Sequence, residues 1–249
     1  MKDTVNRIKP YHDRSESKEE QIVKMFDGIA THYDLLNHTL SLGIDRCWRK
    51  KVVHLLDDIK NPVLLDVATG TGDLALALSA LKPVSVYAVD ISTKMLEIAY
   101  KKIKKRRLQM TVFPKIAAAD ELPFANNTFN AVTVGFGVRN FENLTRSLTE
   151  MTRVLKPGGK MAVLEFSKPA KFPVKQLYMF YFTKILPWWG GIVSGDRKAY
   201  RYLASSVIQF PEGELFEQEL VKAGLMPICS LRQTFGIATI YLAQKPLSR

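Results

Sequence analysis

The sequence predicts an α/β fold with a doubly wound, mostly parallel seven-stranded sheet, and two features of its pattern support this class. Short apolar runs rich in β-branched residues alternate with segments of helical periodicity, which is the arrangement of a parallel sheet covered by helices on both faces. The last two apolar runs are separated only by Phe235 and Gly236, which favours an antiparallel hairpin at one edge of the sheet.

A helical cap is expected before the first strand. Apolar residues recur at helical spacing through residues 20–60, with a break predicted at residues 33–38 because Asn and Asp favour turns. Residues 1–19 are charged and are expected to form a mobile tail. Residues 20–249 are then interpreted as a single domain.

The middle and the end of the chain alternate strands with helices in a regular order. Strands are expected at residues 63–68, 84–90, 111–116, 130–136, 160–166, 228–234 and 237–243. Helices are expected at residues 73–81, 93–107, 144–155 and 212–223. Ser92 is a suitable N-cap for the second of these helices, which ends in a run of cations at the negative end of its dipole.

Residues 171–210 interrupt the alternation, and we interpret them as a helical insertion that packs as a lid over the strand ends. Nine of the 25 aromatic residues of the chain lie between residues 172 and 202. A packed lid accounts for part of this excess. The remainder favours an apolar wall for a ligand, or an interfacial surface where amphipathic rings prefer to lie.

Composition and charge exclude several classes of protein. A formal charge of +12 fits an anionic partner, such as nucleic acid, anionic lipid or a phosphate-bearing substrate, or no more than a soluble basic surface. The two cysteines and four histidines lack the spacing of a disulfide framework or a zinc site, so we expect a reducing cytosol and no metal. No signal peptide and no membrane-spanning run are expected.

The clearest chemical signal is the glycine loop DVATGTGD after the first expected strand. Gly70 and Gly72 let the backbone approach a ligand and turn tightly into the next helix. Asp90 ends the following strand, where a carboxylate accepts both hydroxyls of a ribose. The spacing to Ala75 also fits a dinucleotide fingerprint. Asp66 before the loop instead favours a cofactor with a positive sulfonium centre, because a pyrophosphate gains nothing from a nearby anion.

Longer motifs carry a family resemblance over about nine-tenths of the chain. The segments DVATGTGD, AVDISTKML, ELPFANNTFNAVTVGFGVRN and EMTRVLKPGGKMAVLEFSKP resemble the class I S-adenosylmethionine-dependent methyltransferases, and more narrowly the quinone C-methyltransferases of menaquinone and ubiquinone synthesis. The resemblance implies S-adenosylmethionine as the cofactor. Together with the glycine loop, it gives as cofactor-binding residues Asp66, Thr69, Gly70, Thr71, Gly72, Asp90, Ile91, Ala118, Ala119 and Asp120.

Two positions depart from the family pattern. The family often has Asp or Asn where this chain has Ala118, so an adenine amino contact is expected from the backbone or from Asp120. A Ser or a similar residue often stands at the position of Gly135, so a hydroxyl contact to the cofactor is expected to be missing there.

The resemblance implies methylation of a ring carbon of a prenylated demethylquinol, and we expect conversion of demethylmenaquinol to menaquinol. Deprotonation of a ring hydroxyl activates the ring carbon, so the protein aligns the partners and stabilises phenolate charge. Arg139 and Asn140 follow the fourth strand, beside the expected position of methyl transfer. His38 has a suitable intrinsic pKa for proton removal, and Tyr200 could orient a ring hydroxyl.

Two of these catalytic assignments have a structural alternative. Arg139 could form an ion pair with Glu142 or Glu165. His38 could be a surface or structural histidine. Asp34, in the expected break of the cap, could line the quinone pocket with Tyr33.

The expected partners follow from the substrate. A prenylated quinol lies in a bilayer, so we expect a cytoplasmic protein that contacts the anionic inner face of the cytoplasmic membrane through its basic, aromatic insertion. Two other activities remain open, namely methylation of nucleic acid and methylation of a benzoquinol by the same chemistry. A nucleotide-binding module without enzymatic activity is a third class. We expect no nucleic-acid partner, and the sequence leaves the oligomeric state open, a homo-oligomer included.

Overall fold

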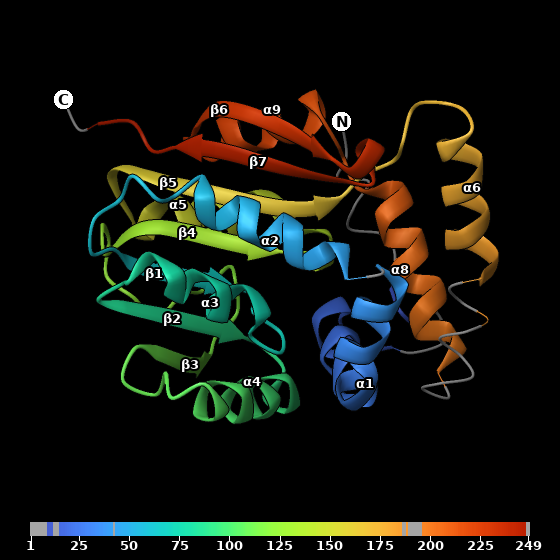
Figure 1. Ribbon diagram of the computed structural model, residues 1–249, viewed down its shortest axis with the longest axis horizontal. Helices are drawn as coiled ribbons and strands as arrows, with labels where there is room; N and C mark the ends of the chain where they lie inside the picture. Colours follow the sequence, from blue (N-terminus) through green and yellow to red (C-terminus); the bar gives the residue numbers. More distant parts are fainter. Residues whose placement is uncertain (1–8, 12–14, 42, 186–187, 189–195, 248–249) are drawn as a thin grey trace.

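A seven-stranded sheet in the order β3-β2-β1-β4-β5-β7-β6 forms the centre of the molecule (Figure 1). The computed structural model describes residues 9–11, 15–41, 43–185, 188 and 196–247, without the side chains of residues 32, 35–40 and 197. The strands are β1 (Val63–Val67), β2 (Ser85–Asp90), β3 (Val112–Ile116), β4 (Phe129–Gly135), β5 (Leu155–Phe166), β6 (Met226–Gln233) and β7 (Ala238–Gln244). β1 to β5 are parallel, whereas β7 is antiparallel to β5 and β6. The expected fold class is confirmed.

Helices cover both faces of this sheet, which explains why the inner strands β1, β2 and β4 are mostly buried, whereas the edge strands β3 and β6 are more exposed. One face is covered by α2 (Ile44–His54), α3 (Asp73–Leu78) and α4 (Thr93–Lys105), and the other by α5 (Leu144–Val154) and α9 (Glu214–Lys222). Successive residues of a strand alternate between these layers: Leu64 belongs to the same hydrophobic cluster as Trp48 of α2, and Leu65 to the same cluster as Leu148 of α5.

A third group of helices lies beyond the carboxyl ends of the parallel strands (Figure 1). It consists of α1 (Lys18–Leu40), α6 (Val174–Phe180), the π-helical turn η4 (Tyr181–Ile185) and α8 (Arg197–Gln209). Met25 and Ile29 of α1 pack with Tyr178 of α6 and Tyr200 of α8 in a separate hydrophobic cluster. The helical character expected for residues 171–210 is confirmed within the described residues, and this insertion and α1 form one layer.

The break expected at residues 33–38 is wrong, because α1 continues without interruption to Leu40. The chain turns only after it, where Gly43 has a left-handed φ of 73° and precedes α2. Asp34, which favours turns when its side chain binds its own backbone, instead accepts a hydrogen bond from Thr71 and pairs with Lys102. Distant partners therefore replace the local interaction that would have ended the helix.

Other boundaries differ from expectation by a few residues. β5 begins at Leu155, directly after α5, so the segment with Pro157 and two glycines extends the strand. The hairpin between β6 and β7 contains the short helix η5 (Thr234–Gly236) and is longer than the predicted two-residue connection. α1 begins at Lys18, and before it the backbone of Tyr11 donates a hydrogen bond to Gln21 at 2.9 Å. No helix among the described residues has the length and apolar character needed to cross a membrane.

Candidate active site

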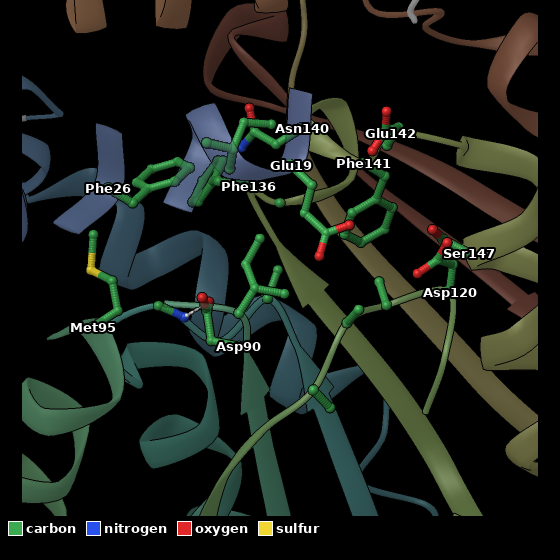
Figure 2. A pocket seen from close by; sticks show the side chains of 18 of the residues that line it. Glu19, Phe26, Asp90, Met95, Asp120, Phe136, Asn140, Phe141, Glu142 and Ser147 are labelled. Atoms are coloured by element: carbon green, nitrogen blue, oxygen red, sulfur yellow. Dashed lines mark hydrogen bonds between the residues drawn. The ribbon is translucent and has the colours of Figure 1, made fainter. Parts of the chain in front are cut away.

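Two cavities lie at the carboxyl edge of the sheet, under the helical layer. The first has a volume of 90 Å³ and is lined mainly by α1 and the loops after β1, β2, β3 and β4 (Figure 2). The second, 570 Å³, lies between α2, α6, η4 and α8. Tyr33 of α1 and Phe136 after β4 line both cavities, so the two spaces share a wall.

The backbone at this shared wall has an uncommon conformation. Phe136 has a φ of +60°, in the left-handed region that non-glycine residues rarely adopt. The next residue must be glycine, because a Cβ at Gly137 would lie 2.6 Å from the Cβ of Ala68 in the loop after β1. The loops after β1 and β4 are thus in close contact at Ala68 and Gly137, directly after Phe136.

Asp90, the last residue of β2, lines the first cavity and is hydrogen-bonded to the glycine loop (Figure 2). The carboxylate of Asp90 accepts hydrogen bonds from the backbone N–H of Gly70 at 2.8 Å and of Ser92 at 2.9 Å. Gly70 itself has a left-handed φ of 56°. Burial raises the pKa of Asp90, while the two backbone N–H groups favour its ionised form. The result is an oriented acceptor at the cavity wall.

Asp66 does not line either cavity, although the sequence placed it beside the cofactor. It is completely buried under the glycine loop and accepts hydrogen bonds at 2.6 Å from the hydroxyls of Thr69 and Thr133. Burial raises the pKa of Asp66 to about 6, against the lowering effect of these hydroxyls. Its geometry is that of a group that holds the loop, and Thr69 is engaged in the same contact.

Thr71 connects the glycine loop to the cap and is not part of the cavity lining. Its hydroxyl donates a hydrogen bond to Asp34 of α1 at 2.5 Å. Lys102 of α4 pairs with Asp34 at 2.5 Å and with Asp73 at 2.7 Å. Asp34 therefore contacts the glycine loop and does not line the second cavity, although the sequence suggested it for the quinone pocket. Gly72 lies inside this turn, packed against α4 at Ala99.

Further contacts hold α1 over the first cavity. Ser92 donates to Asp27 of α1 at 2.5 Å, and Lys18 donates to the carbonyl oxygen of Phe141 at 2.8 Å. Burial lowers the pKa of Lys18 to about 8. The cap is thus joined to the loops after β1, β2 and β4.

The far end of the first cavity is acidic. Ile91, Ala118, Ala119 and Asp120 line it as the sequence suggested, and Asp120 also lies 3.4 Å from Arg146. Glu19 of α1 lines the same cavity, and burial together with the charges of Asp120 and Glu142 raises the pKa of Glu19. Sequence reasoning missed Glu19, because only the position of α1 over the sheet brings it there. Gly135 also lines the first cavity, and a Cβ at this position would lie 3.2 Å from Leu74 of α3.

The second cavity has a mostly apolar and aromatic wall. Its apolar and aromatic residues include Trp48, Phe136, Phe166, Val174, Leu177, Tyr178, Tyr181, Phe182, Ile185, Tyr200, Leu203, Val207 and Ile237. Ser41, Asp45, Arg49, Arg139 and Thr234 provide its polar groups. Such a wall suits a flat, apolar molecule with a few polar atoms.

Arg139 and Asn140 lie on the short helix η3 (Val138–Asn140) and serve different cavities. Arg139 lines the second cavity and is paired with the fully buried Glu165 at 2.6 Å. Of the two ion pairs expected from the sequence, with Glu142 or with Glu165, the structure contains the one with Glu165. Its guanidinium also lies 5.4 Å from the ring centroid of Phe166. Asn140 lines the first cavity and accepts a hydrogen bond from Tyr202 at 3.3 Å.

The remaining catalytic candidates have different outcomes. Tyr200 is buried and lines the second cavity. The side chain of His38 lies outside the described residues. Among the residues that the structure describes, no group of three or more His, Cys, Asp or Glu side chains is placed to hold a metal ion.

Comparisons with known proteins agree on one family. A family model described as the ubiE/COQ5 methyltransferase family matches residues 14–245. A Bacteroides fragilis protein named demethylmenaquinone methyltransferase is 43% identical over 240 residues, 96% of this chain and 98% of that protein. A Geotalea daltonii protein named ubiquinone/menaquinone biosynthesis C-methyltransferase UbiE is 42% identical over 92% of this chain and 97% of that protein.

A solved structure shows the same fold at low identity. The crystal structure of the 4+2 cyclase SpnF covers 92% of this chain and 97% of its own, with a TM-score of 0.66 and 19% identity. At this identity the likeness concerns the fold alone, because one fold hosts many reactions.

Proposed function

Because the chain belongs to the ubiE/COQ5 methyltransferase family, we propose that it transfers a methyl group from S-adenosylmethionine to a ring carbon of a prenylated demethylquinol, converting demethylmenaquinol to menaquinol. The family makes the chain a methyltransferase with S-adenosylmethionine as methyl donor. The acceptor is taken from the names of the relatives, and a benzoquinol of ubiquinone synthesis is the second candidate.

The pair of cavities with a shared wall is the observation that carries this proposal. Methyl transfer needs a donor and an acceptor in separate sites that meet at one point. Tyr33 and Phe136 mark such a point, between a cavity built from the glycine loop and a larger, apolar cavity. No nucleophilic side chain is required, because the sulfonium of the cofactor supplies both the electrophilic methyl group and the leaving group.

The residues of the first cavity fit the cofactor chemically. Asp90 is an oriented double acceptor, suited to the two hydroxyls of a ribose. Ile91 and residues 118–120 line the end where we place the adenine, with Asp120 as the side-chain acceptor for its amino group. Gly70 and Ala68 allow the chain of the cofactor to pass close to the backbone. Because α1 leaves only 90 Å³ here, we expect α1 to shift when the cofactor binds.

The second cavity fits the acceptor. Its 570 Å³ falls within the roughly 300–1,000 Å³ of small-molecule sites. Leu177 and Ile185 line this cavity and are also 66% and 40% exposed to solvent, so the cavity opens beside α6 and η4. A ring could then lie near Phe136 while an attached prenyl chain extends out through this opening.

Arg139 is suited to stabilise charge on the acceptor. Its pairing with Glu165 fixes the guanidinium on the cavity wall, so we assign it electrostatic stabilisation of a phenolate and not proton removal. Asn140 positions the turn between the two cavities through its contact with Tyr202. Tyr200 and His38 stay as candidates for handling the proton of the ring hydroxyl.

We also propose contact with an anionic membrane surface through the insertion face, defined as Phe172, Leu177, Phe180, Ile185 and Trp188 with Lys171, Lys175 and Lys184. These apolar side chains are 40% to 80% exposed, and the three lysines beside them are exposed as well. Rings and aliphatic groups flanked by cations are typical of an interfacial surface. The opening of the second cavity lies on this face, where a substrate dissolved in lipid would enter. Trp189, one of the nine aromatic residues between residues 172 and 202, lies outside the described residues.

The activity is tested directly with labelled S-adenosylmethionine. We expect a single methyl group on a ring carbon of demethylmenaquinol, found by mass analysis of the product. Parallel reactions with a demethylbenzoquinol and with tRNA measure the alternatives. Methylation of RNA without methylation of either quinol would overturn the proposal, and preference for the benzoquinol would replace its substrate.

The membrane contact is tested with vesicles of anionic lipid at low and high salt. The double variant Phe172→Ser/Phe180→Ser should bind vesicles more weakly and lose more activity on a long-chain quinol in vesicles than on a short-chain analogue in solution. Leu215→Ser/Val221→Ser is the matched control, because these residues are 52% and 57% exposed on α9, away from the insertion face. Equal effects of the two double variants would remove the insertion face as the membrane contact.

A further inference from the structure

Three buried polar atoms near the second cavity have no hydrogen-bond partner among the described residues. They are the hydroxyl of Tyr178, Nε of Arg139 and Oε2 of Glu165. Arg139 and Tyr178 line the second cavity, and Glu165 is the partner of Arg139 behind it. Buried polar groups are nearly always satisfied in proteins, so several unsatisfied atoms around one space point to a missing partner.

The hydroxyl of Tyr178 is the most informative of the three. Tyr178 comes from α6, is only 7% exposed, and packs its ring against Phe182 with centroids 4.7 Å apart. Phenylalanine would make the same packing without leaving a hydroxyl unsatisfied in an apolar wall. Packing therefore accounts for the ring of Tyr178 but not for its oxygen.

The electrostatic surroundings fix which role this hydroxyl can take. Burial raises the pKa of Tyr178, while the positive charge of Arg139 opposes this shift and the negative charge of Glu165 adds to it. The phenol consequently stays protonated at neutral pH and is a hydrogen-bond donor. The two donors belong to one space, since Arg139 and Tyr178 both line the second cavity.

We propose that the hydroxyl of Tyr178 donates a hydrogen bond to a ring oxygen of the bound acceptor, and that Tyr178 and Arg139 together stabilise the negative charge on this oxygen. The inference rests on the proposed function, because it takes the acceptor to be a hydroxylated aromatic ring. Two donors fixed in a water-poor wall strengthen as charge develops on the oxygen, which is how preorganised donors lower a barrier. Tyr178 is then a catalytic residue contributed by the insertion.

The test removes one oxygen atom and keeps the ring. Tyr178→Phe should lower kcat/KM for the demethylquinol about tenfold to a hundredfold, while the affinity for S-adenosylmethionine stays the same. Its Tm should be unchanged or a few degrees higher, because an unsatisfied buried donor is removed. Tyr100→Phe is the matched control, since Tyr100 is 52% exposed on α4, and it should behave as the unmodified protein.

A binding measurement gives a second readout that needs no turnover. The probe is 4-nitro-1-naphthol, whose ionised form absorbs visible light. At a fixed pH below the pKa of the free probe, the unmodified protein should hold more of the bound probe as the anion than Tyr178→Phe does, because the variant lacks one donor to its oxygen.

The outcomes separate this inference from the proposed function. If the unmodified protein methylates no quinol, the proposed function fails, and the ionised fraction of the bound probe still decides whether Tyr178 faces a ring oxygen. If Tyr178→Phe methylates as fast as the unmodified protein and holds as much ionised probe, the inference is overturned. A large fall of Tm with a parallel loss of cofactor affinity would also overturn it, since the hydroxyl would then be structural.

Discussion

Replacing Asp66 by Asn tests the claim that this carboxylate holds the glycine loop from below at a cost in stability. Asp66 is fully buried, and burial raises its pKa from 3.8 to about 6. In an unfolded chain the group ionises near 3.8, so between these values the folded state binds more protons than the unfolded state. Stability from this group is therefore complete at low pH and is lost as pH rises from about 4 to about 7.

The magnitude follows from the size of the shift. Each pKa unit corresponds to about 1.4 kcal/mol, so ionisation of Asp66 costs the folded state about 3 kcal/mol at pH 8, roughly half of it between pH 5 and pH 8. Asp66→Asn does not titrate. Its free energy of unfolding relative to the unmodified protein should hence improve by about 1.5 kcal/mol between pH 5 and pH 8.

The assay is urea unfolding of both proteins at the two pH values. Because Thr69 and Thr133 must each find a new partner on the amide, the absolute difference at one pH is not diagnostic, whereas its change with pH is. Asp58→Asn, the same change at an exposed carboxylate, measures the contribution of surface charge. A stability difference for Asp66→Asn that stays constant from pH 5 to pH 8, or moves in the other direction, would refute the reasoning.

Three further outcomes are expected. Asp90→Ala should weaken S-adenosylmethionine binding tenfold to a hundredfold or more in calorimetric titration, because lost hydrogen bonds to a charged acceptor are worth about 1.5–3 kcal/mol each, and unchanged affinity would remove it from the site. Arg139→Gln should lower turnover about a hundredfold, and it should destabilise the fold by about 3–5 kcal/mol because it leaves Glu165 unpaired. The double variant Arg139→Gln/Glu165→Gln should regain stability in urea unfolding, but its turnover should stay low. Recovery of both would make Arg139 structural. Asp34→Ala should speed release of S-adenosylmethionine in stopped-flow experiments, because it removes the hydrogen bond between α1 and Thr71. Its Tm should change little, because the core stays intact. An unchanged release rate would show that this contact does not hold α1 in place.

The order of the elements could be predicted from local pattern, because each strand is a short apolar run and each covering helix has its own apolar periodicity. The end of α1 could not be predicted. Asp34 favours a turn in isolation, and only its pairing with Thr71 and Lys102, distant in sequence, keeps it inside a helix.

The candidate site was predictable in part for the same reason. The glycine loop and Asp90 follow from spacing after two strands, and the structure places Asp90 in the first cavity. Asp66 was expected to face the cofactor, but a carboxylate on a buried strand can lie beneath a loop as readily as beside it. Glu19 has no local signal, and Tyr178 had only the general one of the aromatic insertion, which did not single it out. Each faces a cavity only because α1 or α6 lies over the strand ends.

Helix α1 is hydrogen-bonded through Lys18, Asp27 and Asp34 to the loops after three different strands. These hydrogen bonds all come from one continuous helix, so we expect them to break together and not one by one. Tyr33, on the same helix, lines both cavities. We therefore expect movement of this helix to open both cavities in a single event. Release of the two products would then be kinetically linked, and the frequency of this movement would set an upper limit on kcat.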